Sequence, residues 1–504
     1  MELIVKKLGG ENAACLYMSS QNILEDHKKW NKQIVVVSAM RSSEVNTTDY
    51  LIKIGQWLSE DQADRDKIFW YIQILEDFHI WIVSHKVPNI SDSVLEIVHA
   101  EFSEFKEIID QYLLSSKNTI IPTSQNDYSI EWKNKQDFSI IGFWEVLSSK
   151  ILATIIWFLG DDSVSTQSID LSHIVSTGDI SWKKESEVFK ILEDKIYTKT
   201  HSVLESGFIP VLPGYIWVFE WWIQTVIWRW YTDATAAICI VGFAHKWYEW
   251  VLEIQKSVRW VLSADPRMLY NSDSAHLIPQ MDYVTAREIT GDCWANAKLL
   301  HSQAIRAEVQ DAGVRIHLFD PFCQMKSEGT WVVPSVNESE WNKESHLFVW
   351  GRKNIIFFSV SSGKMFEAWI LANIFTIVQK YFSVDIISAS ETEVSFTIDG
   401  SADIQKKLDE LEAELRIACN IPENSHMEFI EYRPNKALVF CVGQYMKDHI
   451  WLLSKASTIL AKNDINIEIV SQGRLQRAMV FWIDEVDMQK AINVLHDEFI
   501  GNIS

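Results

Sequence analysis

The chain contains little glycine for its length. Only 18 of its 504 residues are glycine, whereas 23 are tryptophan. Because glycine averages about 7% of protein sequences, this chain holds about half of the expected number. The tryptophans recur at turns and lack the spacing of a helix or strand core. We therefore predict that many tryptophan codons here are UGA codons that the organism reads as glycine. The alternative is a genuinely tryptophan-rich protein.

Basic residues are also scarce. The 46 Lys and Arg are outnumbered by 68 Asp and Glu, which gives a formal net charge of -22. Binding along a nucleic acid needs a concentrated basic surface, so nucleic acid is not expected as the main partner. This charge balance is compatible with a soluble cytoplasmic enzyme.

Signals for membranes, secretion and metal binding are missing. The apolar run 215–244 contains Glu220, Arg229 and Asp233, each costly at a bilayer centre, so no span is expected. The N-terminus lacks the apolar core and cleavage site of a signal peptide. The six cysteines are scattered without a CxxC pair, which argues against a zinc site or a disulfide framework.

The first two thirds of the chain alternate between strand-like and helix-like segments. Short β-branched runs at 3–8 and 33–39 predict buried parallel strands. Helical patterns cover 50–118 and 145–158, and a further strand at 208–216 begins an alternation that lasts to about Val333. This order predicts an α/β unit with a mostly parallel sheet.

A polar, linker-like stretch at 334–346 separates this region from two similar units. Each predicts a strand, a helix, two strands and a charged helix, in the manner of a β-α-β-β-α-β fold. The strands that open the two units lie at 354–360 and 437–443, the first helices at 366–381 and 451–463, and the charged helices at 402–417 and 485–498. We expect each unit to have a four-stranded sheet.

The most specific motif is the run from Trp222 to Ala237. With glycine at Trp222, Trp228 and Trp230 it reads G-I-Q-T-V-I-G-R-G-Y-T-D-A-T-A-A, which resembles the aspartate-binding signature of aspartate kinases. The paired C-terminal units resemble ACT domains. The resemblance implies a three-layer amino-acid-kinase sandwich at 1–335, a linker at 336–349, and ferredoxin-like ACT domains at 350–433 and 434–504.

Four further blocks in the family's order carry the same resemblance. Lys7-Leu8-Gly9-Gly10 resembles K-F-G-G, although Glu11-Asn12 replaces the usual Thr-Ser. The loop V-S-A-M-R-S-S followed by T-T resembles the substrate loop, and G-F-W-E-V-L-S resembles S-x-G-E-x-x-S with Trp144 in a glycine position. The nucleotide segments are K-S-V-R-W-V-L-S-A-D-P-R and A-K-L-L-H-S, in which Arg259, Leu262 and Ser302 depart from the family pattern.

The resemblance implies a role for each matching residue. Lys7 and Asp233 would be catalytic; Ser38, Thr47, Thr48, Glu145, Arg229, Thr232 and Asp233 would bind the substrate; and Lys7, Gly9, Gly10, Lys256, Leu262, Asp265, Arg267 and Lys298 would bind ATP. Taken one at a time, the blocks also fit structural roles: a glycine turn, a hydroxyl-rich helix cap, an N-terminal helix acid or surface cations. Their shared order favours the functional interpretation.

The ACT resemblance implies regulation. An inhibitory amino acid, lysine or threonine, would bind at Trp369, Ile370, Leu371, Val384, Asp385, Ser390 and Glu391 in an interface that makes a homodimer. The implied reaction uses ATP and Mg²⁺ to phosphorylate the side-chain carboxylate of L-aspartate, the first step towards lysine, threonine and methionine. Two alternatives stay open: a non-catalytic ACT-containing sensor, and an amino-acid kinase for another acidic substrate.

Overall fold

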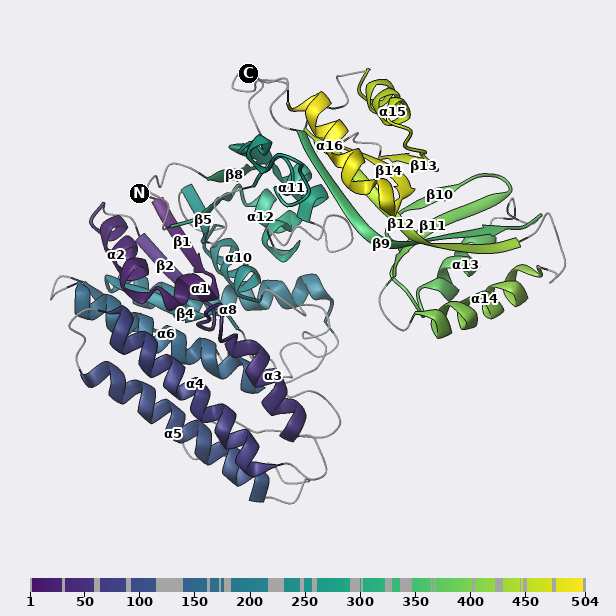
Figure 1. Cartoon of the computed structure of the whole chain (residues 1–504). Helices are drawn as coiled ribbons and strands as arrows, with labels where there is room; N and C mark the ends of the chain where they lie inside the picture. The colour runs from purple at the N-terminus through teal and green to yellow at the C-terminus, as the bar shows by residue number, and fades with distance from the viewer. Residues whose placement is uncertain are drawn as a thin grey trace. The chain divides into compact units, whose positions relative to one another are not determined.

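The structure is a computed structural model, drawn in Figure 1. It describes residues 2–29, 32–58, 64–87, 92–114, 139–160, 164–171, 174–175, 183–215, 231–244, 249–255, 261–290, 300, 302–321, 329–335, 347–363, 365, 367, 369–400, 404–421, 429–444, 446, 451–473 and 477–501. These residues form two compact units, 1–260 with 303–334 and 261–302 with 335–504. Among the described helices, none combines the length and apolarity needed to cross a membrane.

The first unit is built on a mostly parallel sheet. Its strands are β1 (Glu2–Leu8), β2 (Lys32–Val37), β3 (Ser165–Ser168), β4 (Phe208–Pro213), β5 (Glu249–Gln255), β7 (Arg315–Phe319) and β8 (Thr330–Val333). They follow the order β3-β4-β2-β1-β5-β7-β8, and only β7 and β8 pair antiparallel. Parallel strands are buried on both faces, which explains the continuous Ile and Val runs of β1 and β2.

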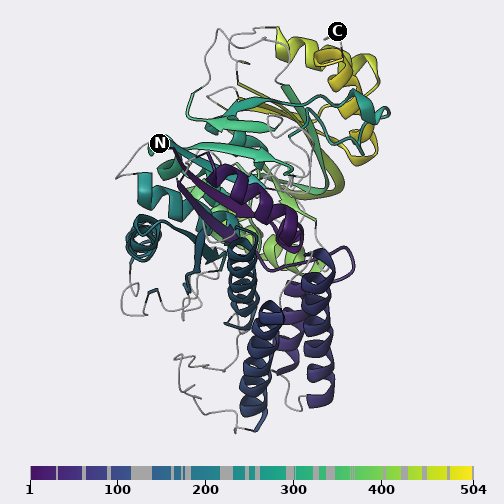
Figure 2. The same ribbon diagram turned by 90° about the vertical axis from the view of Figure 1, so that its left-hand side faces the viewer.

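Helices cover both faces of this sheet, as the prediction of a three-layer sandwich requires. They are α1 (Gly10–Ala14), α2 (Leu16–His27), α3 (Thr47–Leu58), α4 (Arg65–Lys86), α5 (Asp92–Leu114), α6 (Ser139–Leu159), α8 (Glu185–Glu205), α10 (Tyr231–Ala244) and α12 (Ala307–Asp311). Leu8 of β1 packs into a core with α2 and α6, whereas α10 contacts β1, β2 and β5 and packs against α8. Figure 2 shows α3, α4 and α5 as a group of long helices extending from the sheet.

The second unit contains one continuous six-stranded antiparallel sheet. Its strands are β9 (Leu347–Ser361), β10 (Ile387–Ala389), β11 (Glu393–Asp399), β12 (Phe429–Gly443), β13 (Ile469–Gln472) and β14 (Ala478–Asp484), in the order β10-β11-β9-β12-β14-β13. Its helices are α11 (Tyr283–Thr290), α13 (Ile370–Val378), α14 (Gln405–Cys419), α15 (Leu452–Lys462) and α16 (Met488–Phe499). The short strand β6 (Gln280–Asp282) precedes α11.

Each repeat has the expected four-stranded sheet, and the two sheets join into one because β9 and β12 each serve both repeats. The second half of β9 pairs with β11 and with the first half of β12, while the first half of β9 pairs with the second half of β12. The halves meet at irregularities near Asn354 and Asn435, whose φ angles are 61° and 62°. Residues 347–352 therefore complete the sheet of the second repeat, and the first repeat is inserted into the second.

The compact units also divide the chain differently from the predicted domain limits. Residues 261–302, which the prediction assigns to the kinase domain, pack with the C-terminal repeats. Ala264 and Leu269 lie in the same hydrophobic core as α15 and α16 of the second repeat. The first repeat has its own core, between the sheet and α13 and α14. The domain limits remain a prediction, but this segment belongs to the second unit by its packing.

Candidate active site

Lys7 lies near the carboxyl end of β1 and forms a buried ion pair. Its Nζ atom is 2.7 Å from Oδ1 of Asp233, in the first turn of α10. The two side chains are 4% and 0% exposed. A fully buried carboxylate is costly unless it is paired, so each charge holds the other in place. The structure thus brings together the two residues that the sequence predicts to be catalytic.

Glu145 of α6 reaches the same edge of the sheet. Its Oε1 accepts hydrogen bonds from the hydroxyl of Ser38, which follows β2, at 3.3 Å and from that of Thr232 at 3.2 Å. Burial raises the pKa of Glu145 to about 7, against the opposing effect of these hydrogen bonds and of the Lys7 charge. Oε2 has no hydrogen-bond partner among the described residues, which leaves one buried acceptor for a donor from a ligand.

The predicted substrate loop packs around these groups. The hydroxyl of Thr47, buried at the start of α3, donates to the carbonyl of Met40. The Met40 amide donates to the hydroxyl of Ser148 at 3.3 Å, which ties the loop to α6. Thr48 follows in the first turn of α3 and is only partly buried. Thr47 thus holds the loop in shape, a role that the substrate-contact prediction did not include.

The glycine pair after β1 allows close backbone approach. A Cβ atom on Gly10 would lie 2.6 Å from the carbonyl oxygen of Ala39, so only glycine fits there without a shift. The Gly9 amide donates to the carbonyl of Gln255 at 3.4 Å. The unusual Glu11 pairs with Arg41 at 3.4 Å, which offsets the negative charge that this chain adds beside the loop.

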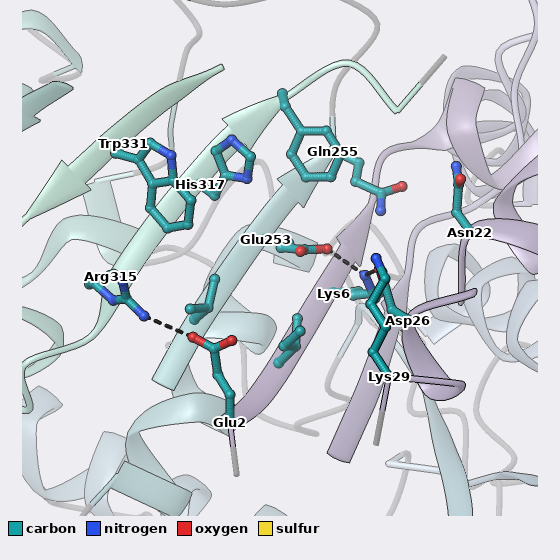
Figure 3. A pocket seen from close by; sticks show the side chains of 13 residues that line it. Glu2, Lys6, Asn22, Asp26, Lys29, Glu253, Gln255, Arg315, His317 and Trp331 are labelled. Atoms are coloured by element: carbon teal, nitrogen blue, oxygen red, sulfur yellow. Dashed lines mark hydrogen bonds and ion pairs between the residues drawn. The ribbon is translucent and has the colours of Figure 1, made fainter. Parts of the chain in front are cut away.

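The opposite face of β1 carries a different arrangement, shown in Figure 3. Lys6 is buried between Asp26 of α2, at 2.6 Å, and Glu253 of β5, at 2.5 Å. It lines a pocket of about 430 Å³ whose other wall carries Arg315, paired with Glu2 at 2.8 Å. The remaining lining residues are Ile4, Asn22, Lys29, Val251, Gln255, His317, Phe319 and Trp331. The three cations of this pocket, Lys6, Lys29 and Arg315, are balanced by three acids.

Several predicted site residues lie elsewhere. Arg229, Lys256 and Lys298 are outside the described residues. Asp265 and Arg267 lie in the second unit, where the guanidinium of Arg267 forks onto the Asp265 carboxylate at 3.0 and 2.7 Å. Leu262, half-buried in the same segment, forms a bridge with Leu277. The structure therefore describes part of the predicted ATP site and brings together Lys7, Gly9 and Gly10 from that set.

The predicted effector residues all belong to the first repeat. Trp369 caps the start of α13 with 46% exposure, followed by the buried Ile370 and the exposed Leu371. Asp385, preceded by the half-buried Val384, binds Arg352 at 2.9 Å. The exposed Ser390 and Glu391 lie in the turn between β10 and β11.

The second repeat carries a matching feature that the sequence prediction missed. Trp451 caps the start of α15 with 44% exposure, followed by the buried Leu452 and the exposed Leu453. The two caps have nearly the same backbone angles, φ of -89° and -91°. An alignment of the two repeats would have shown that Trp369 and Trp451 occupy equivalent positions.

Trp144 is a predicted glycine position that lies within the described residues. This indole is fully buried in α6, stacked on His79 at 5.3 Å and in contact with Phe102 and Phe105. Its Nε1, like those of Trp250, Trp350 and Trp482, is buried without a hydrogen-bond partner among the described residues, which is unusual for tryptophan. Trp217, Trp221, Trp222, Trp228, Trp230, Trp260 and Trp294 lie outside the described residues. The reading as glycine stays a prediction.

Comparison with known proteins agrees with the fold. A family model of the ACT domain matches residues 439–499. Aspartokinase of Schizosaccharomyces pombe is 23% identical over 99% of this chain and 92% of its own length. The crystal structure of Clostridium acetobutylicum aspartate kinase has a TM-score of 0.71 at 20% identity and covers 99% of this chain and 100% of its own. Escherichia coli aspartokinase III with aspartate and ADP has a TM-score of 0.67 at 18% identity, covering 98% of this chain and 99% of its own. The same enzyme has also been solved with lysine and aspartate, with a TM-score of 0.65.

The α/β unit has the fold of an amino-acid kinase, and the paired repeats after it have the ACT fold. Similarity to aspartokinases extends over 99% of the chain. In sequence and in fold the chain is similar to aspartate kinases that carry ACT domains.

Proposed function

We propose that this chain transfers the γ-phosphoryl group of ATP to the side-chain carboxylate of L-aspartate, giving 4-phospho-L-aspartate and ADP. The observation that carries the proposal is the buried Lys7–Asp233 pair beside Glu145, at the carboxyl ends of β1 and β2. In open α/β sheets ligands bind at this edge. The aspartate and ADP held by the Escherichia coli enzyme support the choice of substrates.

The geometry suits phosphoryl transfer between two anions. A carboxylate oxygen of aspartate attacks the γ-phosphorus, the bond to the β-phosphate oxygen breaks, and ADP leaves with the electron pair. The attacking carboxylate is already ionised, so catalysis consists of positioning and charge neutralisation. Lys7 neutralises charge on the transferring group, and Asp233 fixes the direction of its ammonium.

The remaining pocket residues hold the substrate. Glu145, whose second carboxylate oxygen lacks a partner among the described residues, binds the α-ammonium of aspartate. Ser38 and Thr232 fix the Glu145 carboxylate through its other oxygen, and Thr47 and Thr48 shape the adjoining loop. Arg229, in the G-R-G position of the signature, would clamp a carboxylate of the substrate with its planar fork.

The nucleotide would lie on the glycine pair and on the basic nucleotide segments. Gly9 and Gly10 permit close approach of a phosphate, and Lys256, Leu262, Asp265, Arg267 and Lys298 complete the predicted contacts. No cluster of three metal-binding side chains exists among the described residues. Mg²⁺ would be carried by the ATP phosphates and supply charge neutralisation there.

The ACT repeats would regulate the enzyme. An effector amino acid, lysine or threonine, would bind the first repeat around Trp369 and Asp385, in a homodimer formed through the repeats. The lysine present in one Escherichia coli aspartokinase III structure supports this class of effector. We place the kinase domain at 1–335, the linker at 336–349, and the ACT domains at 350–433 and 434–504, and we place the enzyme in the cytoplasm.

The test is ADP release by the protein purified from its native source. ATP is supplied with L-aspartate, L-glutamate or carbamate in separate reactions. We expect turnover with L-aspartate alone. Turnover with another acid in its place would assign a different amino-acid kinase. Release of no ADP with any acceptor, alongside amino-acid binding by calorimetry, would assign a sensor.

The tryptophan prediction is tested with two synthetic genes. One encodes the printed sequence, and the other places glycine at 144, 217, 221, 222, 228, 230, 260 and 294. We expect an active kinase only from the second gene. If both proteins are equally active, these tryptophans are authentic. The matched control restores Trp144 alone in the second gene. Trp144 is fully buried, and replacing a buried aromatic side chain by a small one costs about 3–5 kcal/mol of unfolding free energy.

A further inference from the structure

The segment that carries the A-D-P-R motif is attached to the last helix of the second ACT repeat. Asn493 of α16 makes hydrogen bonds to two residues that follow the motif, Met268 and Tyr270. Its Oδ1 accepts from the amide of Tyr270 at 2.7 Å, and its Nδ2 donates to the carbonyl of Met268 at 2.9 Å. Nδ2 also donates to the carbonyl of Gln489 in the same helix at 2.8 Å. Asn493 is 4% exposed, so all three hydrogen bonds are shielded from water.

One turn further along α16, His496 holds the other end of the motif. Its Nε2 lies 2.9 Å from the hydroxyl of Ser263, and both side chains are fully buried. The same hydroxyl accepts from the amide of His276 at 3.0 Å, and the Ser263 carbonyl accepts from the amide of Val349 in β9. Asn493 and His496 are three residues apart and so share one face of the helix.

A third contact fixes the segment from the edge of β14. Arg477 binds Asp282 at 2.9 Å, with side chains 19% and 7% exposed. Asp282 also accepts from the amide of Thr285 at 2.8 Å and so caps α11. All three anchors, Asn493, His496 and Arg477, therefore come from the second repeat.

The corresponding helix of the first repeat has no such polar face. The buried residues of α14 are Leu408, Leu411, Leu415 and Cys419, which pack into the core of that repeat. The buried face of α16 instead includes Asn493 and His496. Buried polar side chains cost stability unless they are satisfied, and here Nε2 of His496 and both polar atoms of the Asn493 amide find partners among residues 263–270.

Resting on the proposed function, we propose that Asn493 and His496 are positioning residues for the nucleotide. They fix the turn 263–270, and with it the Asp265–Arg267 fork, to the second ACT repeat. The second repeat is thereby part of the nucleotide-binding apparatus as well as of the sensor sheet. A change in the sensor that moves α16 changes the affinity for ATP, while the aspartate pocket around Lys7 and Glu145 is unaffected.

The test compares nucleotide affinity with aspartate kinetics in the full chain. In Asn493→Leu, loss of the two buried hydrogen bonds to Met268 and Tyr270 is expected to raise the ADP Kd and the ATP KM about tenfold or more. The aspartate KM should stay constant. Asn493→Asp keeps the acceptor for Tyr270 but turns a carboxylate oxygen towards the Met268 carbonyl in place of the donor, so it should shift the ADP Kd in the same direction.

His496→Gln supplies the rescue and Gln489→Ala the control. A glutamine amide can still bind the Ser263 hydroxyl, so His496→Gln should bind ADP better than His496→Leu. Gln489 is exposed on the same helix, and its loss should change nothing. An unchanged ADP Kd in both Asn493 variants would overturn the proposal. Equal rises in the ATP KM and the aspartate KM, accompanied by a fall in Tm, would also overturn it. Because ADP binding is measured by calorimetry without turnover, its outcome is independent of whether aspartate is the acceptor.

Discussion

Lys6 and Lys7 are neighbours on β1, yet they face opposite sides of the sheet and have different surroundings. Lys6 lies between two carboxylates, Asp26 and Glu253; burial lowers its pKa, but the two acids outweigh burial and leave the pKa raised. Lys7 has Asp233 at 2.7 Å, beside hydroxyls and a carboxyl that is half protonated near neutrality. Lys6 is enclosed by two acids, whereas Lys7 pairs with one acid at the edge of the sheet where ligands bind in open α/β folds. We therefore assign a structural role to Lys6 and a catalytic role to Lys7.

The largest expected effect is on stability, at Lys6. Lys6→Met leaves Asp26 and Glu253 facing each other in a buried site, which should cost about 3–5 kcal/mol of unfolding free energy. The kcat of the folded fraction should stay close to that of the parent. Urea unfolding and active-site-normalised kinetics measure the two quantities. A fall in kcat with intact stability would place Lys6 in the reaction centre.

The opposite outcome is expected at Lys7. Lys7→Arg keeps the charge beside Asp233, so the fold should persist, but a planar fork cannot replace a single ammonium at the transferring phosphate. We expect kcat to fall about 10²–10³-fold, the usual cost of losing one electrostatic contact to the transition state. Lys6→Arg is the matched control and should retain activity. Equal kinetics for the two arginine variants would remove the distinction.

A smaller effect is expected from pH, through Glu145. Its pKa of about 7 lies above the ordinary value of 4.5. Between these two pH values the Glu145 carboxyl is protonated in the folded protein and ionised in the unfolded chain. The contribution of Glu145 to stability therefore falls as pH rises from about 4.5 to about 7. Binding of the substrate ammonium needs the ionised form, so the aspartate KM should rise about tenfold from pH 8 to pH 6.

Glu145→Gln sharpens this prediction, because an amide does not titrate. The variant should have a high aspartate KM at every pH, without the rise between pH 8 and pH 6. A pH dependence that persists in Glu145→Gln would assign the titration to another group. The ATP KM serves as the internal control and should be the same in both proteins.

The smallest effect is expected at Glu11, which departs from the family pattern. Glu11 and Arg41 are each 43% exposed, and exposed pairs contribute less than about 1 kcal/mol. Glu11→Ser should therefore change the unfolding free energy little and leave the ATP KM unchanged or slightly lower, since a negative charge near phosphate is removed. A marked loss of activity would show that Glu11 participates in binding.

The sequence predicted the α/β unit, the duplicated repeats and the Lys7, Asp233 and Glu145 cluster. The α/β unit and the repeats are marked by residues close together along the chain, whereas Lys7, Glu145 and Asp233 were brought together by the resemblance to aspartate kinases. The sequence alone did not show which of Lys6 and Lys7 is catalytic. Their side chains point to opposite faces of β1, and the helices that cover each face cannot be read from the local sequence. The resemblance to aspartate kinases made that choice.

Long-range pairing accounts for what the sequence could not predict. The prediction divides the first half of β9 between the linker, which ends at 349, and the first ACT unit, which begins at 350; only pairing with β12 makes it a strand of the second repeat. The anchors of the nucleotide motif are separated from it by 223 and 233 residues, Asn493 from Tyr270 and His496 from Ser263. No local periodicity reports such contacts.

The most direct measurement of the central claim is chemical identification of the product. Hydroxylamine converts an acyl phosphate to a hydroxamate, so the reaction is run with ATP, L-aspartate and hydroxylamine and analysed by mass spectrometry. The account predicts aspartyl hydroxamate from the parent protein and from Lys6→Arg, in amounts equal to the ADP released, and very little from Lys7→Arg. ADP release without hydroxamate, or equal hydroxamate from Lys7→Arg, would contradict it.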